Sequence, residues 1–364
     1  MSAERMTILK MLEEGKITAA EAERLLNALG EQQKSDEEEK DIFDALGEGL
    51  DRAFKAVQNM DLGKIVDSTV ASVGEKVEAV QRSDVGDMVS EFIDEVTESI
   101  GDITGESKRE LSQESEWALE VEEVIGLKAN TSNGEVEVVG VDEEEMSVKA
   151  LIKVKAPDDA AARAFFEQVA VSVERQGDEI VIKKEHPKPP KKVRVQVNYY
   201  IRCPRRLEVE VHTLNGGVRV HGMAAAIQAA TANGDVEIRG GRGRLHARTK
   251  NGKVLAEVDV LEERGEFSSA NGKVEVKISA GQAPVEAQTL NGSVAVSLPA
   301  DFAGQLEAQT SNGRVHCDFP VIQAGPGRKN RLAGPLGKGG ETLVKLKTLN
   351  GNIDLHKLAD SADA

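Results

Sequence analysis

Apolar and polar residues alternate along most of the chain after residue 115, in short arms on either side of Asn-Gly pairs. The arms 209–213 and 218–220 around Asn215 show the pattern: Val209, Val211 and Thr213 share one phase, and Val218 and Val220 continue it after the pair. Alternation with a period of two predicts half-buried β-strands. Because Asn-Gly tolerates positive φ, we expect the chain to bend at each pair.

The Asn-Gly pairs recur with a nearly fixed period, and each is followed two residues later by Val or Ile. They are Asn133 and Gly134, Asn215 and Gly216, Asn233 and Gly234, Asn251 and Gly252, Asn271 and Gly272, Asn291 and Gly292, Asn312 and Gly313, and Asn350 and Gly351. Their spacings are 82, 18, 18, 20, 20, 21 and 38 residues, so the local period is about 20. A period in this range is typical of repeat proteins, in which each unit buries its apolar face against its neighbours.

Two architectures satisfy one repeat. In a two-residue hairpin, Thr213 would pair with Val218 and Val211 with Val220. In a β-solenoid, each Asn-Gly is a corner between two strands of one rung, and the Asn side chains stack from rung to rung. The near-constant period favours the solenoid. Aromatic residues make up only 3% of the chain, which predicts a thin aliphatic interior.

Charge divides the chain near residue 115. Residues 1–114 hold 28 acidic and 13 basic side chains, whereas residues 115–364 hold 35 acidic and 33 basic ones. An acidic N-terminal segment therefore precedes a nearly neutral β unit.

The ends of a β-solenoid expose unpaired strand edges. If they lack a cap, these edges would favour self-polymerisation.

Residues 1–30 are predicted to form a helical hairpin. The first helix ends at Gly15, and Thr18 with Glu21 has the form of a capping box that opens the second. Its apolar stripe includes Ile8, Leu12, Ile17, Leu25, Leu26 and Leu29. A hairpin this short cannot bury enough surface to stand alone. We expect it to dock on its own β unit, on a second copy or on a protein partner.

Residues 31–117 are predicted to be an acidic linker followed by amphipathic helices. Val66, Val70, Val73, Val77 and Val80 follow the 4-3 spacing of a helix–helix seam. Interfacial membrane helices usually carry a basic face, and this segment is acidic. Protein partnership or self-association through the N-terminal helices is therefore predicted, and membrane contact is possible but is not the prediction.

The run from Ile8 to Leu26, ILKMLEEGKITAAEAERLL, resembles the SHOCT-like helical hairpin of bacterial envelope-stress proteins. The Thr-x-Asn-Gly-x-Val repeats, and the closing run from Gly337 to Leu355, resemble the "putative adhesin" or Toast-rack β-solenoid family. Together the resemblances cover residues 1–30 and 118–357. They imply an envelope-stress setting, and they supply no established catalytic activity. They also imply that residues 141–206 elaborate the first rungs, with strands at 148–154, 169–173 and 179–183 and a helix at 158–168.

No catalytic, cofactor or metal site is expected. The six histidines have no metal-ligand spacing, and His212 and His316 fall on the polar phase of their strands. Cys203 and Cys317 are expected to be buried thiols. Basic residues cluster at 239–248 and 188–206, but a pI near 5.0 opposes nucleic-acid binding. These clusters could instead bind the acidic N-terminal segment of the same chain.

The sequence thus predicts a mainly β protein with a helical N-terminal segment and a disordered tail at 358–364. We expect a non-enzymatic scaffold or sensor that acts through protein–protein interaction. The alternative is an adhesin-like module that binds an envelope polysaccharide or peptide. The chain shows no signal sequence and no run of about 18 apolar residues, so a cytoplasmic location is expected.

Overall fold

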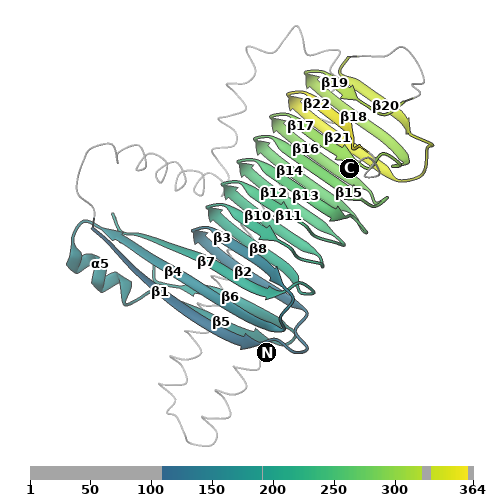
Figure 1. Ribbon diagram of the computed structural model, residues 1–364. Helices are drawn as coiled ribbons and strands as arrows, with labels where there is room; N and C mark the ends of the chain where they lie inside the picture. The colour runs from purple at the N-terminus through teal and green to yellow at the C-terminus, as the bar shows by residue number, and fades with distance from the viewer. Residues whose placement is uncertain (1–108, 191, 322–328, 360–364) are drawn as a thin grey trace, which may run out of the picture. The chain divides into compact units, whose positions relative to one another are not determined.

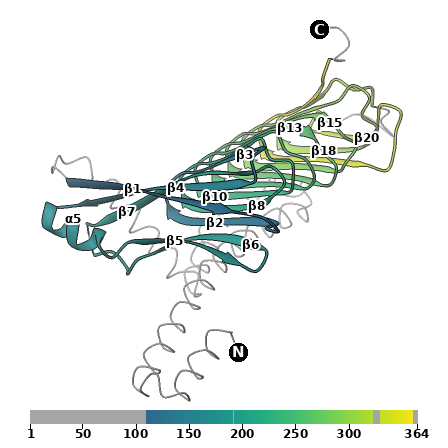
Figure 2. The same ribbon diagram turned by 60° about the horizontal axis from the view of Figure 1, so that its bottom comes forward.

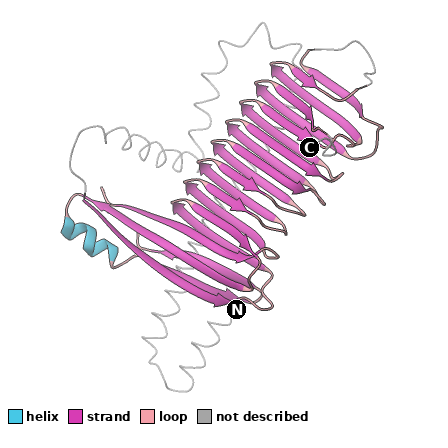
Figure 3. Ribbon diagram, viewed as in Figure 1, coloured by secondary structure: helices cyan, strands magenta, loops and turns pink. Residues whose placement is uncertain are grey.

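The structure is a computed structural model, which describes residues 109–190, 192–321 and 329–359 (Figure 1). These residues all belong to one compact unit, Val96–Ala364. The predicted hairpin at 1–30, the predicted helices up to residue 108 and the tail from residue 360 lie outside the described residues. Within the described part, strands dominate and one short helix is present (Figure 3).

The strands form two sheets of eleven strands each. In spatial order, the first sheet contains β1 (Arg109–Glu120), β4 (Glu145–Ala156), β7 (Arg194–Pro204), β3 (Val136–Val141), β9 (Val218–His221), β11 (Val236–Arg239), β13 (Val254–Val260), β15 (Val274–Ala280), β17 (Val294–Leu298), β22 (Ile353–Lys357) and β19 (Val315–Cys317). The second contains β20 (Arg331–Leu336), β18 (Gly304–Asn312), β21 (Leu343–Asn350), β16 (Val285–Asn291), β14 (Gly265–Asn271), β12 (Leu245–Asn251), β10 (Ile227–Asn233), β8 (Glu208–Asn215), β2 (Gly126–Asn133), β6 (Glu179–Glu185) and β5 (Ala170–Gln176).

Each Asn-Gly pair joins a strand of the second sheet to a strand of the first, and the resulting rungs stack in parallel (Figure 1). Thr213 on β8 lies beside Thr131 on one side and Thr231 on the other, rather than opposite Val218. The hairpin alternative is therefore wrong, and the solenoid prediction is confirmed. Parallel stacking places identical repeat positions next to each other, which explains why the period is maintained along the chain.

The core lies between the two sheets, one of which covers the other in Figure 2. Inward positions alternate with outward ones along each strand, as in the buried Val209 and Val211 of β8 and Val218 and Val220 of β9. The buried residues are mostly Val, Ala, Leu and Ile, which agrees with the low aromatic content. Close aliphatic packing of this kind holds the sheets at a uniform separation.

The segment between β3 and β8 accounts for the 82-residue gap between the first two Asn-Gly pairs. Strands β4 and β5, each antiparallel to its neighbour, and helix α5 (Asp159–Phe166) lie within a residue or a few of the predicted positions. Asp158 caps α5 by accepting a hydrogen bond of 2.8 Å from the Ala161 backbone N–H. Strands β6 and β7 stack in parallel on β2 and β3 as an additional rung that has no Asn-Gly corner.

The β unit begins earlier than the predicted boundary at residue 118. Strand β1 starts at Arg109 and pairs with β4 along its full length. Its outward residues include Glu110, Glu114 and Glu116, which face lysines of β4 across the pair. Residues 109–117, which were predicted to belong to the segment of acidic linker and helices, therefore lie in an edge strand of the β unit.

The last two rungs stack out of sequence order (Figure 1). Strand β21 lies between β16 and β18, and β22 lies between β17 and β19. After β19 the chain returns as β20, which pairs antiparallel with the outer edge of β18. Only the inner edge of β18 is then open to β21. The outer edge strand β20 carries Pro335, a residue that discourages further strand addition.

Close backbone contact between rungs requires glycine as the second residue of every Asn-Gly corner. A Cβ atom added at Gly252 would lie 1.9 Å from the carbonyl oxygen of Gly234 in the preceding rung, and Gly252 has a φ of 157°. At Gly216 the same contact with the Gly134 oxygen would be 2.0 Å. All eight corner glycines would meet a backbone oxygen of the neighbouring rung at 2.1 Å or less. No side chain fits at these positions without separating two rungs.

Replacement of Gly252 by Ala tests this contact. We expect a loss of at least about 3 kcal/mol in the free energy of unfolding, because a backbone oxygen cannot move aside as a flexible side chain would. The matched control is Gly217→Ala, where the nearest atom to the added Cβ is the Asp235 oxygen at 3.5 Å. Urea unfolding of the full chain compares the two variants. Equal stabilities would contradict the proposed role of the corner contact.

Candidate functional site

The residues predicted as repeat turns lie in one row of corners along the solenoid. The side-chain Nδ2 of every corner Asn except Asn133 donates to the Oδ1 of the Asn in the neighbouring rung, at 2.8 Å in all seven cases. The order along this row, called here the amide ladder, is Asn133, Asn215, Asn233, Asn251, Asn271, Asn291, Asn350 and Asn312. Each interior Asn donates one bond and accepts one, so the ladder stabilises the stack along its axis.

A second row of hydrogen bonds runs beneath the amide ladder, from the residue two positions before each Asn. The Thr249 hydroxyl donates to the Gly234 carbonyl at 2.8 Å, and the Ser269 hydroxyl donates to the Gly252 carbonyl at 2.9 Å. The equivalent hydroxyls are all buried. The alternation of apolar residues placed Thr213 on the inward phase but did not reveal the hydroxyl donor. The replacement of Thr by Ser in one repeat was the available signal, because Ser shares the hydroxyl but not the branched methyl.

The residues predicted to form the interaction hairpin, namely Ile8, Leu12, Ile17, Leu25, Leu26 and Leu29, lie outside the described residues. Their role stays a prediction. The described part of the chain therefore supplies candidate surfaces only on the β unit.

The outer face of the second sheet presents charged side chains in register from rung to rung. Glu286 of β16 accepts Lys345 Nζ at 2.8 Å from the neighbouring rung and Arg264 Nη2 at 2.8 Å from the turn before β14. Burial tends to raise the pKa of the Glu286 carboxyl, but these two cations outweigh burial and the pKa is lowered. The carboxylate therefore stays ionised at neutral pH and links three successive rungs.

Two arginines of the 239–248 cluster are paired with acidic residues of the adjacent rung. Arg242 lies 3.2 Å from Glu262, and Arg244 lies 3.2 Å from Glu263. In the second cluster, Arg205 lies 2.9 Å from Asp142. Neutralised guanidinium groups of this kind do not form the open basic patch that a phosphate backbone needs. The predicted contact of these clusters with the acidic N-terminal segment involves residues outside the described ones and stays a prediction.

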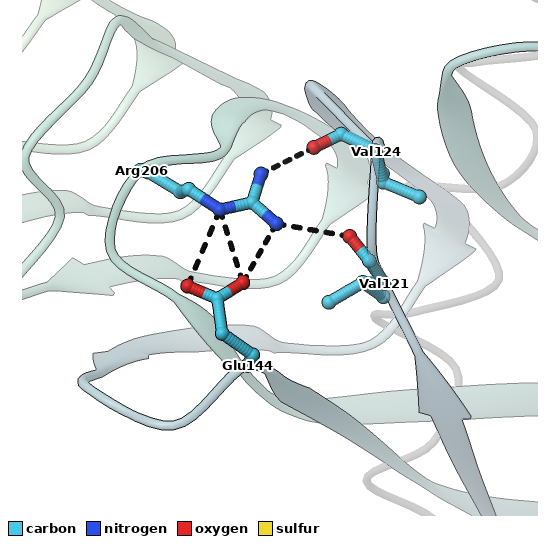
Figure 4. Close-up of polar contacts among 4 residues, drawn as sticks. All are labelled: Val121, Val124, Glu144 and Arg206. Atoms are coloured by element: carbon cyan, nitrogen blue, oxygen red, sulfur yellow. Dashed lines mark hydrogen bonds and ion pairs between the residues drawn. The ribbon is translucent and has the colours of Figure 1, made fainter.

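Arg206 connects three turns at the N-terminal end of the solenoid (Figure 4). Its Nη1 and Nη2 donate to the backbone oxygens of Val124 at 2.5 Å and Val121 at 2.9 Å. Its Nε and Nη2 also bind Glu144, at 3.1 Å and 2.7 Å to Oε2. The guanidinium thus holds the β1–β2 connection against the turn before β4. Nothing in the local sequence distinguishes Arg206 from Arg205, because its partners are more than 60 residues away.

Two histidines meet at the C-terminal rungs. Asp318 accepts His316 Nε2 at 2.9 Å and His356 Nδ1 at 3.1 Å. Hydrogen bonding from His356, followed by contacts with Lys357 and His316, lowers the pKa of the Asp318 carboxyl. His316 is exposed as predicted, whereas His212 is largely buried beside Glu210, contrary to the expectation from its polar phase. In the described part of the chain, no group of three or more His, Cys, Asp or Glu residues could hold a metal ion.

Both cysteines are free thiols in the described structure. Cys203 is buried, and burial raises its pKa to about 12. Cys317 is half-buried, and burial likewise raises its pKa. Neither thiol forms the thiolate that nucleophilic chemistry requires near neutral pH.

Among residues 109–190, 192–321 and 329–359, no helix has the length and apolar character to cross a membrane.

Two family models match parts of the chain. Residues 3–34 match a SHOCT-like domain, which confirms the resemblance of the N-terminal segment. Residues 226–322, which include β10 to β19, match a domain of unknown function, DUF7330. No curated protein matches the chain.

Several solved structures are similar to the β unit at low sequence identity. One, described as a "putative cell adhesion protein" from Clostridium sporogenes ATCC 15579, is 14% identical, covers 68% of this chain and 100% of that chain, and has a TM-score of 0.32. A "putative adhesin" from Bacteroides fragilis NCTC 9343 is 13% identical, covers 70% and 99%, and has a TM-score of 0.29. A "putative lipid binding protein" from Parabacteroides distasonis ATCC 8503 is 13% identical, covers 68% and 97%, and has a TM-score of 0.26. At these identities and TM-scores the similarities carry no functional assignment.

The Arg206 contacts predict a measurable difference between two adjacent arginines. Arg206→Ala should lower the free energy of unfolding by about 2 kcal/mol, because two backbone oxygens and a carboxylate lose their donor. Arg205→Ala removes a single exposed ion pair and should cost no more than about 0.5 kcal/mol. Urea unfolding of both full-length variants gives the comparison. If the two losses are the same, Arg206 does not hold the turns together.

Proposed function

We propose that the protein is a non-enzymatic scaffold or sensor that acts through protein–protein interaction. The observation that carries this proposal is the in-register stacking of the rungs, which places outward side chains in straight rows along two sheet faces. Repeat stacks of this kind present extended surfaces rather than a single concave pocket. Such a surface suits an extended macromolecular partner better than a small substrate.

The N-terminal segment supplies the second part of the proposal. Residues 3–34 match a SHOCT-like domain, and a segment of this length is too small to bury a stable core alone. Its apolar residues, among them Leu12 and Leu26, need a surface to cover them. We assign this segment to binding a protein partner or a second copy, with the β-solenoid as the scaffold that it joins.

The cellular setting in this proposal is the bacterial envelope-stress response, with the protein in the cytoplasm. The setting is supported by the resemblance of the N-terminal hairpin to envelope-stress proteins. Nucleic acid is not a partner in the proposal, since Arg242 and Arg244 are already paired with Glu262 and Glu263.

An adhesin-like module that binds an envelope polysaccharide or peptide is the second candidate. A row on the second sheet favours it, because its half-buried or exposed polar residues Asn130, Gln288, Lys347 and Gln309 could form hydrogen bonds with a repeating ligand. His212 and Ser268 of the same row are buried. In spatial order this row contains Asn130, His212, Ala230, Arg248, Ser268, Gln288, Lys347 and Gln309. Its regular spacing would match an extended chain better than a compact molecule.

Light scattering coupled to chromatography tests the first proposal on the full chain. The wild type should be oligomeric, and the double variant Leu12→Asp/Leu26→Asp should be monomeric because charge on the apolar stripe prevents its burial. The control Glu13→Gln/Glu23→Gln changes the polar positions of the same segment and should stay oligomeric. Calorimetric titration of the full chain with peptidoglycan fragments tests the second candidate. A monomeric wild type that binds these fragments would replace the scaffold proposal with the adhesin-like one.

A further inference from the structure

The eight Asn-Gly pairs share a chemical weakness as well as a structural role. The backbone nitrogen of the residue after Asn can attack the side-chain carbonyl carbon, and Gly allows this attack most readily because it has no Cβ and a flexible backbone. The attacking nitrogen must first lose its proton to a base. A hydrogen bond from that N–H to a neighbouring carbonyl therefore protects the pair.

Seven of the eight corner glycines have this protection. Each donates its backbone N–H to the carbonyl oxygen of the Asn in the adjacent rung, at distances from 2.8 to 3.1 Å. The donors are Gly134, Gly216, Gly234, Gly252, Gly272, Gly292 and Gly351. The amide ladder also holds the side chains of the interior Asn residues from both sides.

The eighth corner, at Asn312 and Gly313, belongs to the terminal rung and differs from the others. No rung follows it, and the Gly313 N–H forms no backbone hydrogen bond with any of the described residues. The amides on either side of the corner are bonded to the returning chain, Thr310 N to Asn330 O at 2.9 Å and Val315 N to Lys329 O at 2.9 Å. Among the described residues, the returning chain thus bonds both arms of this rung but not its corner, and Asn312 is exposed.

We propose that Asn312 is a site of spontaneous deamidation in the folded protein, and that the other seven Asn-Gly pairs resist it. The deprotonated Gly313 nitrogen attacks Cγ of Asn312, a C–N bond forms, and the bond to the side-chain nitrogen breaks with release of ammonia. Water then opens the resulting five-membered imide at one of its two carbonyls. The product at this position is either an ordinary aspartate or an isoaspartyl residue, in which the backbone runs through the former side chain.

Either product weakens the end of the amide ladder. Asn312 Nδ2 donates to Asn350 Oδ1 at 2.8 Å, and a carboxylate has no hydrogen to replace this donor. The isoaspartyl form also lengthens the backbone between β18 and β19 by one carbon atom. This change would disturb the register of Val315 with Ile353 across β19 and β22. The modification would therefore loosen the terminal rung without altering the interior rungs.

Asn133 is an internal control for this inference. It is also an end of the amide ladder, because only Asn215 bonds its side chain within the ladder. However, the Gly134 N–H donates to Asn215 O at 2.8 Å. If the free N–H decides reactivity, Asn133 is protected although it is a ladder end. If ladder position alone decides, both ends react.

The test compares the eight pairs within one sample. Full-length protein is incubated at mildly alkaline pH, and a second sample is incubated in denaturant, where all pairs are equally accessible. Mass spectrometry of proteolytic peptides then locates aspartate and isoaspartyl products at each position. The ratio of folded to unfolded rate should be at least about tenfold higher for Asn312 than for any other pair. The Asn312→Gln variant should lose the product at that position, since Gln cannot form the five-membered ring.

Two results would overturn the inference. In the first, Asn312 is suppressed in the folded protein as strongly as the interior pairs. In the second, Asn133 or an interior pair reacts as fast as Asn312, which would mean that the bonded Gly N–H gives no protection. A higher rate at higher pH is expected in every case where reaction occurs, because a base must remove the amide proton.

Discussion

Contacts between the corner glycines of neighbouring rungs set the spacing and the register of the whole stack. A Cβ added at Gly252 or Gly272 would lie 1.9 Å from the backbone oxygen of the rung before it. Only a hydrogen atom fits between the glycine Cα and this oxygen. The distance between neighbouring rungs and their register are therefore fixed. The Gly N–H bonds, the amide ladder and the buried hydroxyls then all form at the same corner. Because these bonds repeat at each step, the two sheets keep a constant geometry along the stack.

Much of this fold could be predicted from the sequence. The Asn-Gly period identified the corners, and the alternation of apolar residues identified the strands and the aliphatic core. The strands and the helix expected within residues 141–206 from the family resemblance lie within a few residues of β4, α5, β5 and β6. The repeat is easy to recognise because every corner needs a glycine next to the backbone oxygen of the neighbouring rung. The same Asn-Gly pair therefore occurs at all eight corners.

Other features could not be predicted because they depend on contacts distant in sequence. The order of the last rungs is set by β20, which covers the outer edge of β18 and directs β21 to the inner edge. Arg206 finds its partners in turns more than 60 residues away. The pairing of Arg242 with Glu262 likewise arises only after two rungs stack. These contacts convert apparent basic clusters into internal ion pairs, and they leave regular polar rows as the surfaces on which a partner could act.

Native-state hydrogen exchange of the corner glycine amides measures directly whether the corners hold the rungs together. We expect slow exchange at Gly134, Gly216, Gly234, Gly252, Gly272, Gly292 and Gly351, whose amides bond the neighbouring rung, and fast exchange at Gly313. The amide of Gly243, in a turn between rungs, provides a reference outside the corners. Corner amides that exchange as fast as this reference would contradict the claim that the Asn-Gly corners lock the rungs together.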